Sequence, residues 1–183
     1  MEKIVASMRG IYRDILKDQN NTVIFDSGWV SNVIVNRCRI LLAAFMKNDP
    51  NKQARGIQRL KIGQGEESWD NDGTPVPDAS LTGLLDPAPF SIEAADLEVV
   101  YLDNNNLEGH IPNPRLQITA TLGTDQPPPP SPGLSFYSLR EFGLFGEYID
   151  GGEVYEYMID CIRHPVIRKN VAATLIRVVR LYF

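Results

Sequence analysis

Two histidines and two cysteines are the side chains in this sequence best suited to nucleophilic, acid–base or metal chemistry. His110 lies in the polar stretch "EGHIPNP", and His164 directly precedes Pro165 in "IRHPVIRK". Catalysis requires such a group to sit among partners, yet the chain has no HExxH, GxSxG or CxxC motif. We therefore expect His110 to be an exposed loop residue and His164 to be a structural residue at the end of a strand.

A second set of reactive groups is a run of carboxylates in a polar stretch after residue 63. They are Glu66, Glu67, Asp70, Asp72 and Asp78. Together with a neighbour, the "DNDG" segment could offer oxygen ligands to calcium, but the EF-hand spacing is absent. Nothing marks a glycosidase pair of carboxylates either. The simpler interpretation is a solvated acidic loop, and we expect no catalytic residue, no cofactor and no bound metal.

Interface residues are easier to nominate than catalytic ones. Trp69 is an indole in a polar loop, and it either folds back on its own domain or anchors a partner together with Asp70. The run Pro127, Pro128, Pro129 and Pro130 is stiff because proline fixes φ and lacks an N–H donor. A surface linker is its simpler interpretation, although the same prolines are candidates for an interface.

Bulk composition excludes several classes of function. The chain has 183 residues and a formal net charge of −5, which disfavours nucleic acid as the main partner. Cys38 and Cys161 stand alone among apolar residues, so we expect buried free thiols and a reducing cytosol. The N-terminus lacks the apolar segment of a secretory signal, and no apolar run approaches the length of a membrane span. We expect a soluble protein that does not insert into membranes.

The N-terminal third predicts a hairpin, a helix and a strand. Turn residues 18–21 separate two short extended runs, which is typical of a hairpin. The stretch "SNVIVNRCRILLAAFMKND" predicts a broadly buried helix that Ser31 or Asn32 caps and that ends before Pro50. The stretch "GIQRLKIG" predicts a strand. A long polar loop follows at about 64–90, and loops of this length usually bind, assemble or move.

The rest of the chain is dominated by strand patterns. The segments "LEVVYLD" and "RLQITATLG" predict a strand, a loop and a strand, and in "RLQITATLG" apolar and polar residues alternate, which indicates a sheet with one buried face. A second long loop at about 124–134 follows, and then "FYSLREFGLFGEY", "EVYEYMIDCIRH" and "AATLIRVVRLYF" predict three more extended segments. The sequence thus predicts one structural domain over 1–183, of α+β class, with an antiparallel sheet or sandwich and one packed helix.

The segment "SLREFGLFG" raises the question of a phosphate-binding loop. Such a loop opens a helix, whereas here a strand precedes and a Gly-Gly hairpin follows. Gly143 and Gly146 are therefore expected where the strand bends or another backbone approaches closely. Alternation places Leu139, Glu141 and Gly143 on one face, and we expect Glu141 to be a buried acceptor for backbone amides or for an arginine such as Arg177.

The order of several landmarks resembles that of small structural proteins from bacteriophage tails and related contractile injection systems. The landmarks are "GWVSNVIVNRCRILLAAFM", "LKIGQGEESWD", "PVPDASLTGLL", "SLREFGLFG" and "IRHPVIRKNVAATLIRVVRLYF". The matching residues are Gly63, Gly65, Trp69, Asp70, Glu141, Phe142, Gly143, Leu144, Phe145, His164, Pro165, Lys169, Thr174, Leu175 and Arg177. One departure is that residues 81–87 lack the Glu and Arg that follow the proline loop in similar proteins.

The resemblance implies a non-enzymatic structural component of a phage tail or injection machine, most simply a baseplate or tail-fibre attachment adaptor. It implies a homo-oligomer, a trimer or a hexamer, that contacts other tail proteins after assembly in the bacterial cytoplasm. A ring-forming adaptor or cap at the other end of the tail is an alternative. A second alternative is a carbohydrate or cell-surface binding module that uses Trp69 for stacking.

Overall fold

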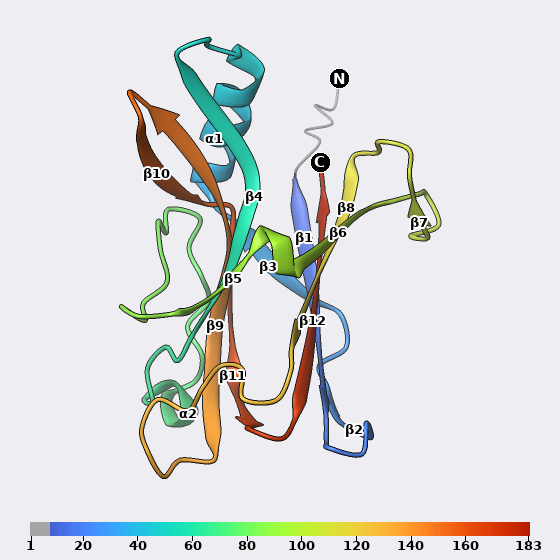
Figure 1. Ribbon diagram of the computed structural model, residues 1–183, viewed down its shortest axis with the longest axis vertical. Coiled ribbons are helices and arrows are strands. Elements are labelled where there is room, and N and C mark those ends of the chain that lie inside the picture. The colour runs from blue at the N-terminus through green and yellow to red at the C-terminus, as the bar shows by residue number, and fades with distance from the viewer. Residues whose placement is uncertain (1–7) are drawn as a thin grey trace.

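The computed structural model describes residues 8–183 and shows a twelve-stranded antiparallel sheet with one helix longer than a single turn (Figure 1). The strands are β1 (Arg9–Lys17), β2 (Val23–Asp26), β3 (Val30–Ile34), β4 (Lys52–Gly63), β5 (Phe90–Glu93), β6 (Leu97–Leu102), β7 (Glu108–Gly109), β8 (Arg115–Leu122), β9 (Phe136–Asp150), β10 (Glu153–Met158), β11 (Asp160–Asn170) and β12 (Thr174–Tyr182). The helices are α1 (Asn36–Lys47), α2 (Trp69–Asp72) and the single 3-10 turn η1 (Ala94–Asp96). The predicted α+β class, with strands dominant and one packed helix, is confirmed.

The sheet curls into a half-barrel whose two halves share strand β3. The strand order is β5-β4-β9-β11-β3-β1-β12-β8-β6-β7, with β10 also on β9 and β2 also on β1. Strand β3 pairs with β1 opposite Gly10–Tyr12 and with β11 opposite Asp160 and Cys161. A few residue pairs on each side of β3 therefore join the two halves of the sheet.

The core fills the concave side of the curled sheet. Every second residue is buried in β12 and, from Ile118 onward, in β8, as the alternating pattern predicts. Ile118 and Leu122 of β8 meet Leu139 and Phe142 of β9 in one apolar cluster. Burial of such side chains contributes about 1.5–3 kcal/mol each, so this cluster is the main source of stability.

Helix α1 is shorter than the sequence predicts. Residues 30–34 form strand β3, and the N-cap is Val35, which makes no side-chain capping bond. The caps expected at Ser31 and Asn32 are therefore wrong. Residues 30–32 pair with β1, and the β-branched Val33 and Ile34 pair with β11, so this stretch is a strand. At the other end Asn48 adopts a left-handed conformation with φ 48° and closes the helix before Pro50.

Strand β11 continues through the His164–Pro165 step, where the sequence predicts a strand end. The pairing of β11 with β9 shifts between Arg163 and Ile167, which marks a bulge around Pro165. A bulge tolerates proline inside a sheet because no ladder hydrogen bond is needed there. The predicted segment "EVYEYMIDCIRH" is instead two strands, β10 and β11, separated at Ile159.

Glycines 143 and 146 let other backbone segments pass close to β9. A Cβ on Gly143 would lie 2.6 Å from the carbonyl oxygen of Asp160, and one on Gly146 would lie 2.6 Å from that of Gly56. The expectation that these glycines permit a close backbone approach is confirmed. Within residues 8–183, no helix has the length and apolar character needed to cross a bilayer.

Candidate functional site

A buried ion pair joins β1 to β12 inside the half-barrel. Arg177 donates from Nε and Nη2 to the two carboxylate oxygens of Asp14 at 2.6 and 2.7 Å, and neither side chain is exposed. The guanidinium also stacks on the Phe142 ring, with its carbon 3.5 Å from the ring centroid. Arg177 was expected near Glu141, and that partner is wrong because Asp14 takes its place.

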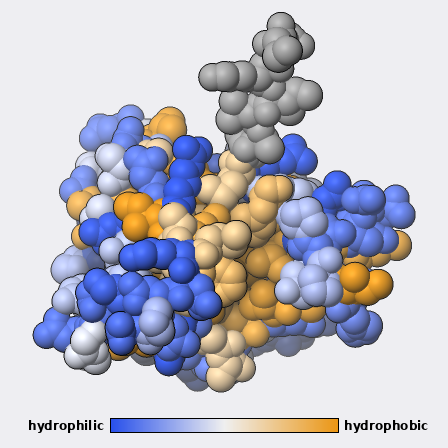
Figure 2. All heavy atoms as spheres, turned by 90° about the horizontal axis from the view of Figure 1, so that it is seen from above, coloured by the Kyte–Doolittle hydropathy of each residue, from blue (hydrophilic) through white to orange (hydrophobic). Residues whose placement is uncertain are grey.

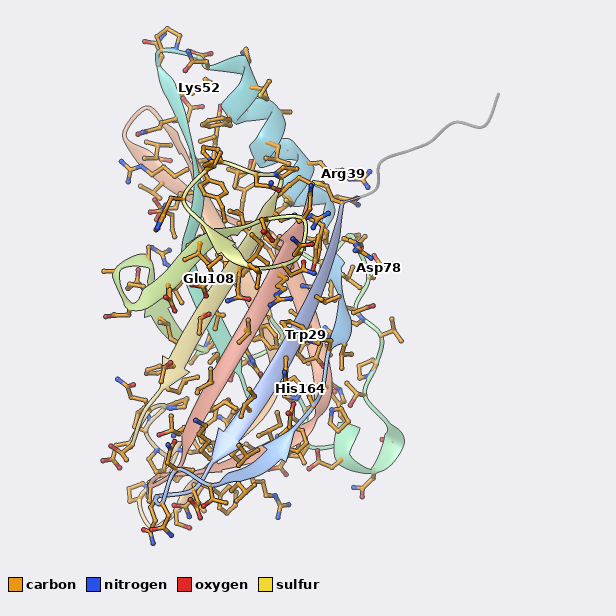
Figure 3. All side chains as sticks on the ribbon, turned by 90° about the vertical axis from the view of Figure 1, so that its right-hand side faces the viewer. Trp29, Arg39, Lys52, Asp78, Glu108 and His164 are labelled. Atoms are coloured by element: carbon orange, nitrogen blue, oxygen red, sulfur yellow. The ribbon has the colours of Figure 1, made fainter. Side chains whose placement is uncertain are left out.

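His164 completes this cluster as a neutral acceptor. Its Nε2 lies 3.0 Å from Arg177 Nη2, and its Nδ1 lies 2.8 Å from the carbonyl oxygen of Pro165. The two contacts are satisfied together when Nδ1 carries the proton and Nε2 accepts. Burial, reinforced by the Arg177 charge, lowers the pKa of His164 to about 4. His164 (Figure 3) is only 4% exposed, so the cluster is sealed from substrates and serves the fold.

Asp160 lies at the seam between the two halves of the sheet. It accepts from the Leu144 backbone N–H at 2.7 Å and from Asn32 Nδ2 at 2.6 Å. Burial raises the pKa of Asp160 to about 7, although these hydrogen bonds and the Arg177 charge oppose that shift. The space for Asn32 exists because residue 10 is glycine, where a Cβ would lie 1.9 Å from Asn32 Oδ1.

Because of these buried groups, we expect the stability of two variants, relative to the wild type, to change with pH in opposite directions. Folded His164 lacks a proton that the unfolded chain binds between about pH 4 and 6.5, so its contribution to stability rises with pH. Folded Asp160 keeps a proton that the unfolded chain loses between about pH 4 and 7, so its contribution falls as pH rises. Relative to the wild type, His164→Gln should therefore lose stability with rising pH, and Asp160→Asn should gain it.

Urea unfolding between pH 4 and 7 measures this signature. The free energy of unfolding of each variant, minus that of the wild type, should change with pH by up to about 1.4 kcal/mol per pH unit. The change is negative for His164→Gln and positive for Asp160→Asn. The wild-type contributions of the two groups nearly cancel over most of this interval. Differences that stay constant with pH would contradict the assignment of both protonation states.

The two cysteines are buried free thiols, as the sequence predicts. Burial raises the pKa of Cys38 to about 11 and that of Cys161 to about 12. A thiol acts as a nucleophile or metal ligand only when deprotonated, so neither cysteine is poised for such chemistry at neutral pH. His110, the other reactive group singled out in the sequence, is exposed.

The loop at 64–90 is fastened to the sheet through Trp69 and Asp70. Trp69 is only 7% exposed, and the Arg163 guanidinium lies 5.0 Å from its ring centroid. Arg140 donates to both carboxylate oxygens of Asp70 at 2.8 Å and to the Gln64 carbonyl oxygen at 2.9 Å. Of the two roles open to Trp69, folding back on its own domain is the one observed.

Glu141 is a buried anchor for the same loop. Its Oε1 accepts from the Asp86 backbone N–H at 2.7 Å, and the side chain is fully buried. The expected burial and the expected backbone-amide partner are confirmed. Its other oxygen lies 3.8 Å from Arg163 Nε, so Arg163 is the nearby cation. Arg140 and Glu141, which the alternation places on opposite faces of the strand, contact different parts of the loop, at Asp70 and at Asp86.

The remaining interface candidates lie in the proline run. Pro127 is buried and follows a cis peptide bond, whereas Pro128 and Pro130 are exposed and Pro129 is partly buried. Only part of the proline run is therefore accessible.

Phe145 packs with Val35, Met158 and Cys161 in a second, smaller apolar cluster. Phe145 thus serves the fold.

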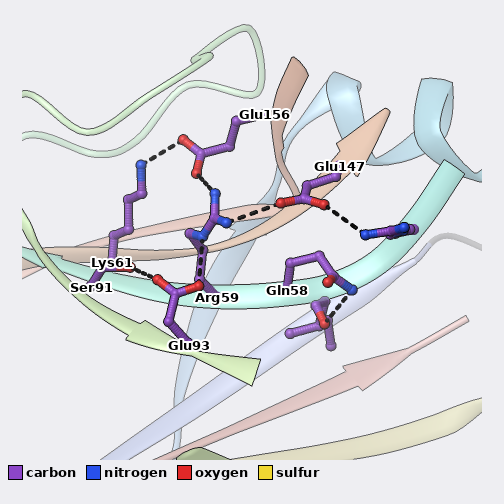
Figure 4. Close-up of polar contacts among 9 residues, drawn as sticks. Gln58, Arg59, Lys61, Ser91, Glu93, Glu147 and Glu156 are labelled. Atoms are coloured by element: carbon purple, nitrogen blue, oxygen red, sulfur yellow. Dashed lines mark hydrogen bonds and ion pairs between the residues drawn. The ribbon is translucent and has the colours of Figure 1, made fainter. Parts of the chain in front are cut away.

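A charge network covers the outer face of β4 (Figure 4). Arg59 donates to Glu156 at 2.8 Å, to Glu147 at 3.0 Å and to Glu93 at 3.3 Å. Lys61 shares Glu156 at 2.6 Å. Each carboxylate therefore has a cation beside it, and this arrangement ties β5, β9 and β10 to β4.

An open apolar cleft lies at the end of the half-barrel where α1 faces β6. Its volume is about 670 Å³, and its walls include Leu42 and Phe45 of α1, Val99 and Tyr101 of β6, and Phe183. Figure 2 shows apolar residues running between two more polar flanks at this end of the molecule. Several wall residues are also exposed, among them Phe45 at 65%. Sequence patterns missed the cleft because its walls come from six separate stretches of the chain, between Cys38 and Phe183.

The side chains that line the cleft are mainly apolar rather than reactive. Arg55, Tyr101 and Asn113 are the lining residues with hydrogen-bonding side chains, and within residues 8–183 the buried Asn113 Oδ1 has no hydrogen-bond partner. Across residues 8–183 no three His, Cys, Asp or Glu side chains gather closely enough to hold a metal ion. Comparisons with protein-family models, curated proteins and solved structures gave no match.

Proposed function

We propose that this protein is a non-enzymatic structural component of a phage tail or a phage-tail-like contractile injection system. Within that class the proposal is a baseplate or tail-fibre attachment adaptor that assembles with itself and with neighbouring tail proteins. It rests on the sequence landmarks together with one structural observation, the open apolar cleft.

The cleft supports an assembly role because exposed apolar surface of this kind marks sites of protein association. Phe45 and Met46 on α1 are 65% and 80% exposed, and Leu107 and Ile111 on the opposite side are 63% and 81% exposed. A small-molecule site usually adds several converging polar groups to an apolar pocket. This cleft has few polar atoms, and its apolar surface extends outward onto both flanks.

The landmark residues support the same interpretation because the contacts they make are architectural. Glu141 and Asp70 fasten the 64–90 loop, and Arg177 and His164 form the buried cluster. Gly143 admits the backbone of β11. A set of residues that determines a scaffold, without an accessible reactive group among them, suits a building block of a larger assembly.

The cell-surface binding module is less favoured as an alternative. That hypothesis needs an open aromatic platform, and Trp69 is 7% exposed with Arg163 beside its ring. The ring-forming adaptor belongs to the same structural class as the leading proposal and differs from it in symmetry and in position along the tail.

Particle isolation tests the proposed function. A tagged copy of the protein, expressed in its native host, should co-sediment with tail or injection particles in a density gradient. Electron microscopy with a tag-directed gold label should then place it at the baseplate, at the fibre attachment points or at the opposite end. Recovery of particles that lack the tagged protein, while it remains abundant in the lysate, would overturn the proposal.

A further inference from the structure

Helix α1 forms one flank of the cleft, here called the basic flank (residues 36–47). It contains three basic residues, Arg37, Arg39 and Lys47, and no acidic residue. Its exposed apolar residues Phe45 and Met46 stand beside these charges. Arg39 (Figure 3) is exposed, and Lys47 makes only a solvent-exposed contact of 3.3 Å with Asp49.

The opposite side of the cleft, residues 94–114, is here called the acidic flank. It carries four carboxylates, Asp96, Glu98, Asp103 and Glu108, and the nearest cation in sequence is Arg115, which donates to the Asp103 carbonyl oxygen at 3.0 Å. Among the described residues none of the four takes part in an ion pair. Glu108 (Figure 3) lies on the connection between β6 and β8, next to the exposed Leu107.

The acidic residues near the basic flank do not remove this asymmetry. Glu147 and Glu156 of β9 and β10 bind Arg59, and Asp150 binds Lys52 at 2.8 Å. Those carboxylates are thus paired with cations of β4. Arg37 contacts the Glu156 carbonyl oxygen at 3.4 Å and lies 5.2 Å from the centroid of the Tyr157 ring. The charges of Arg39 and Lys47 therefore stay available on one side of the apolar cleft, and those of the acidic flank on the other.

We infer that a second copy of this chain docks across the cleft, with helix α1 of one copy against the acidic flank of its partner. Each flank offers exposed apolar side chains and charges of one sign, so the contact is complementary in both respects. Burial of the apolar residues supplies the driving force, and the charges select the orientation. The inference rests on the proposed self-assembly and locates its interface.

The geometry of the cleft also limits the symmetry of this contact. Both flanks border the same cleft, so a two-fold axis through its mouth brings α1 of each copy onto the acidic flank of the other. A head-to-tail arrangement uses the α1 of one copy and the acidic flank of the next, and it gives a ring if the rotation between copies closes and an open filament if it does not. Both arrangements use the same pair of surfaces.

Charge reversal tests the inference on the full chain by sedimentation velocity over a range of concentrations. We expect the wild type to associate. The variant Arg39→Glu/Lys47→Glu and the variant Glu98→Lys/Glu108→Lys should each associate at least about tenfold more weakly, because like charges then meet at the contact. An equimolar mixture of the two variants should associate again, since each reversed flank then faces an opposite charge.

A matched control reverses two exposed carboxylates far from the cleft, Glu66→Lys/Glu67→Lys, and it should associate like the wild type. Thermal melting of every variant shows whether it is folded. A wild type that stays monomeric at all concentrations would overturn the inference. So would reversed variants that associate as the wild type does, or a mixture that does not recover.

These outcomes are distinguishable from failure of the proposed function. If the wild type associates and charge reversal does not weaken the association, the interface lies elsewhere on the surface, and self-assembly itself is still supported. Absence of the protein from tail particles would refute the tail assignment, whatever the sedimentation experiment shows.

Discussion

Replacing Asp14 with asparagine should reduce the free energy of unfolding by about 3–5 kcal/mol, the largest loss that we expect from a single polar substitution here. The substitution leaves the guanidinium of Arg177 buried beside Phe142 without a counter-charge. Among residues 8–183 Arg177 Nη1 already has no hydrogen-bond partner, so the remaining contacts there cannot compensate. Urea unfolding at pH 7, followed by circular dichroism and tryptophan fluorescence, measures the loss.

Two further variants identify the cause of this loss. Arg13→Gln breaks the neighbouring surface ion pair of β1 with Asp26, and it should change stability little because exposed pairs contribute little. The double variant Asp14→Leu/Arg177→Met removes both buried charges, and it should recover much of the stability that Asp14→Asn loses. An Asp14→Asn loss no larger than that of Arg13→Gln would contradict the role of the buried pair.

Gly146→Ala should also destabilise the protein, by about 3 kcal/mol, the upper end of the range for overpacking a core. A Cβ at this position would lie 2.5 Å from Leu41 Cδ2, 2.6 Å from the Gly56 carbonyl oxygen and 2.7 Å from that of Arg55. The leucine can rotate away, but the two backbone oxygens move only if β4 separates from β9. Thermal melting and urea unfolding measure the effect.

Gly56→Ala is the matched control for this prediction. Gly56 lies in β4 at the same strand pair, and a Cβ there would have no heavy atom within 4 Å. We expect Gly56→Ala to be neutral or slightly stabilising, because alanine restricts the unfolded chain more than glycine does. Equal effects of the two substitutions would show that the close approach of the backbones does not determine stability.

Local patterns in the sequence predicted much of this fold because strand alternation is a local signal. The strands at 115–122 and 174–182 follow the expected alternation, and a strand was also predicted correctly at 97–102. The helix start was misplaced because residues 30–34 have apolar residues at spacings that suit a helix or a strand. Only their pairing with β1 and β11, distant in sequence, decides between the two.

The buried polar cluster was harder to predict, although the sequence contains one indication of it, a charged residue among the inward-facing apolar residues of β1 and of β12. Asp14 lies between the inward-facing Tyr12 and Leu16, and Arg177 lies between the inward-facing Leu175 and Val179. A charged residue within an apolar face indicates a buried partner of opposite sign, but it does not identify that partner. Here the two partners are 163 residues apart, a distance over which a single sequence carries no pairing signal.

The pairing of β1 with β12 has a consequence for how the protein is made. All nine residues of β1 pair with β12, from Arg9 opposite Tyr182 to Lys17 opposite Thr174. At about 5–20 residues per second, the ribosome completes β12 on the order of ten seconds after β1. Until then the apolar side of β1 has no place in a finished core, and pairing of such distant segments is intrinsically slow. One edge of β1 therefore stays without its partner strand until the last strand has been made.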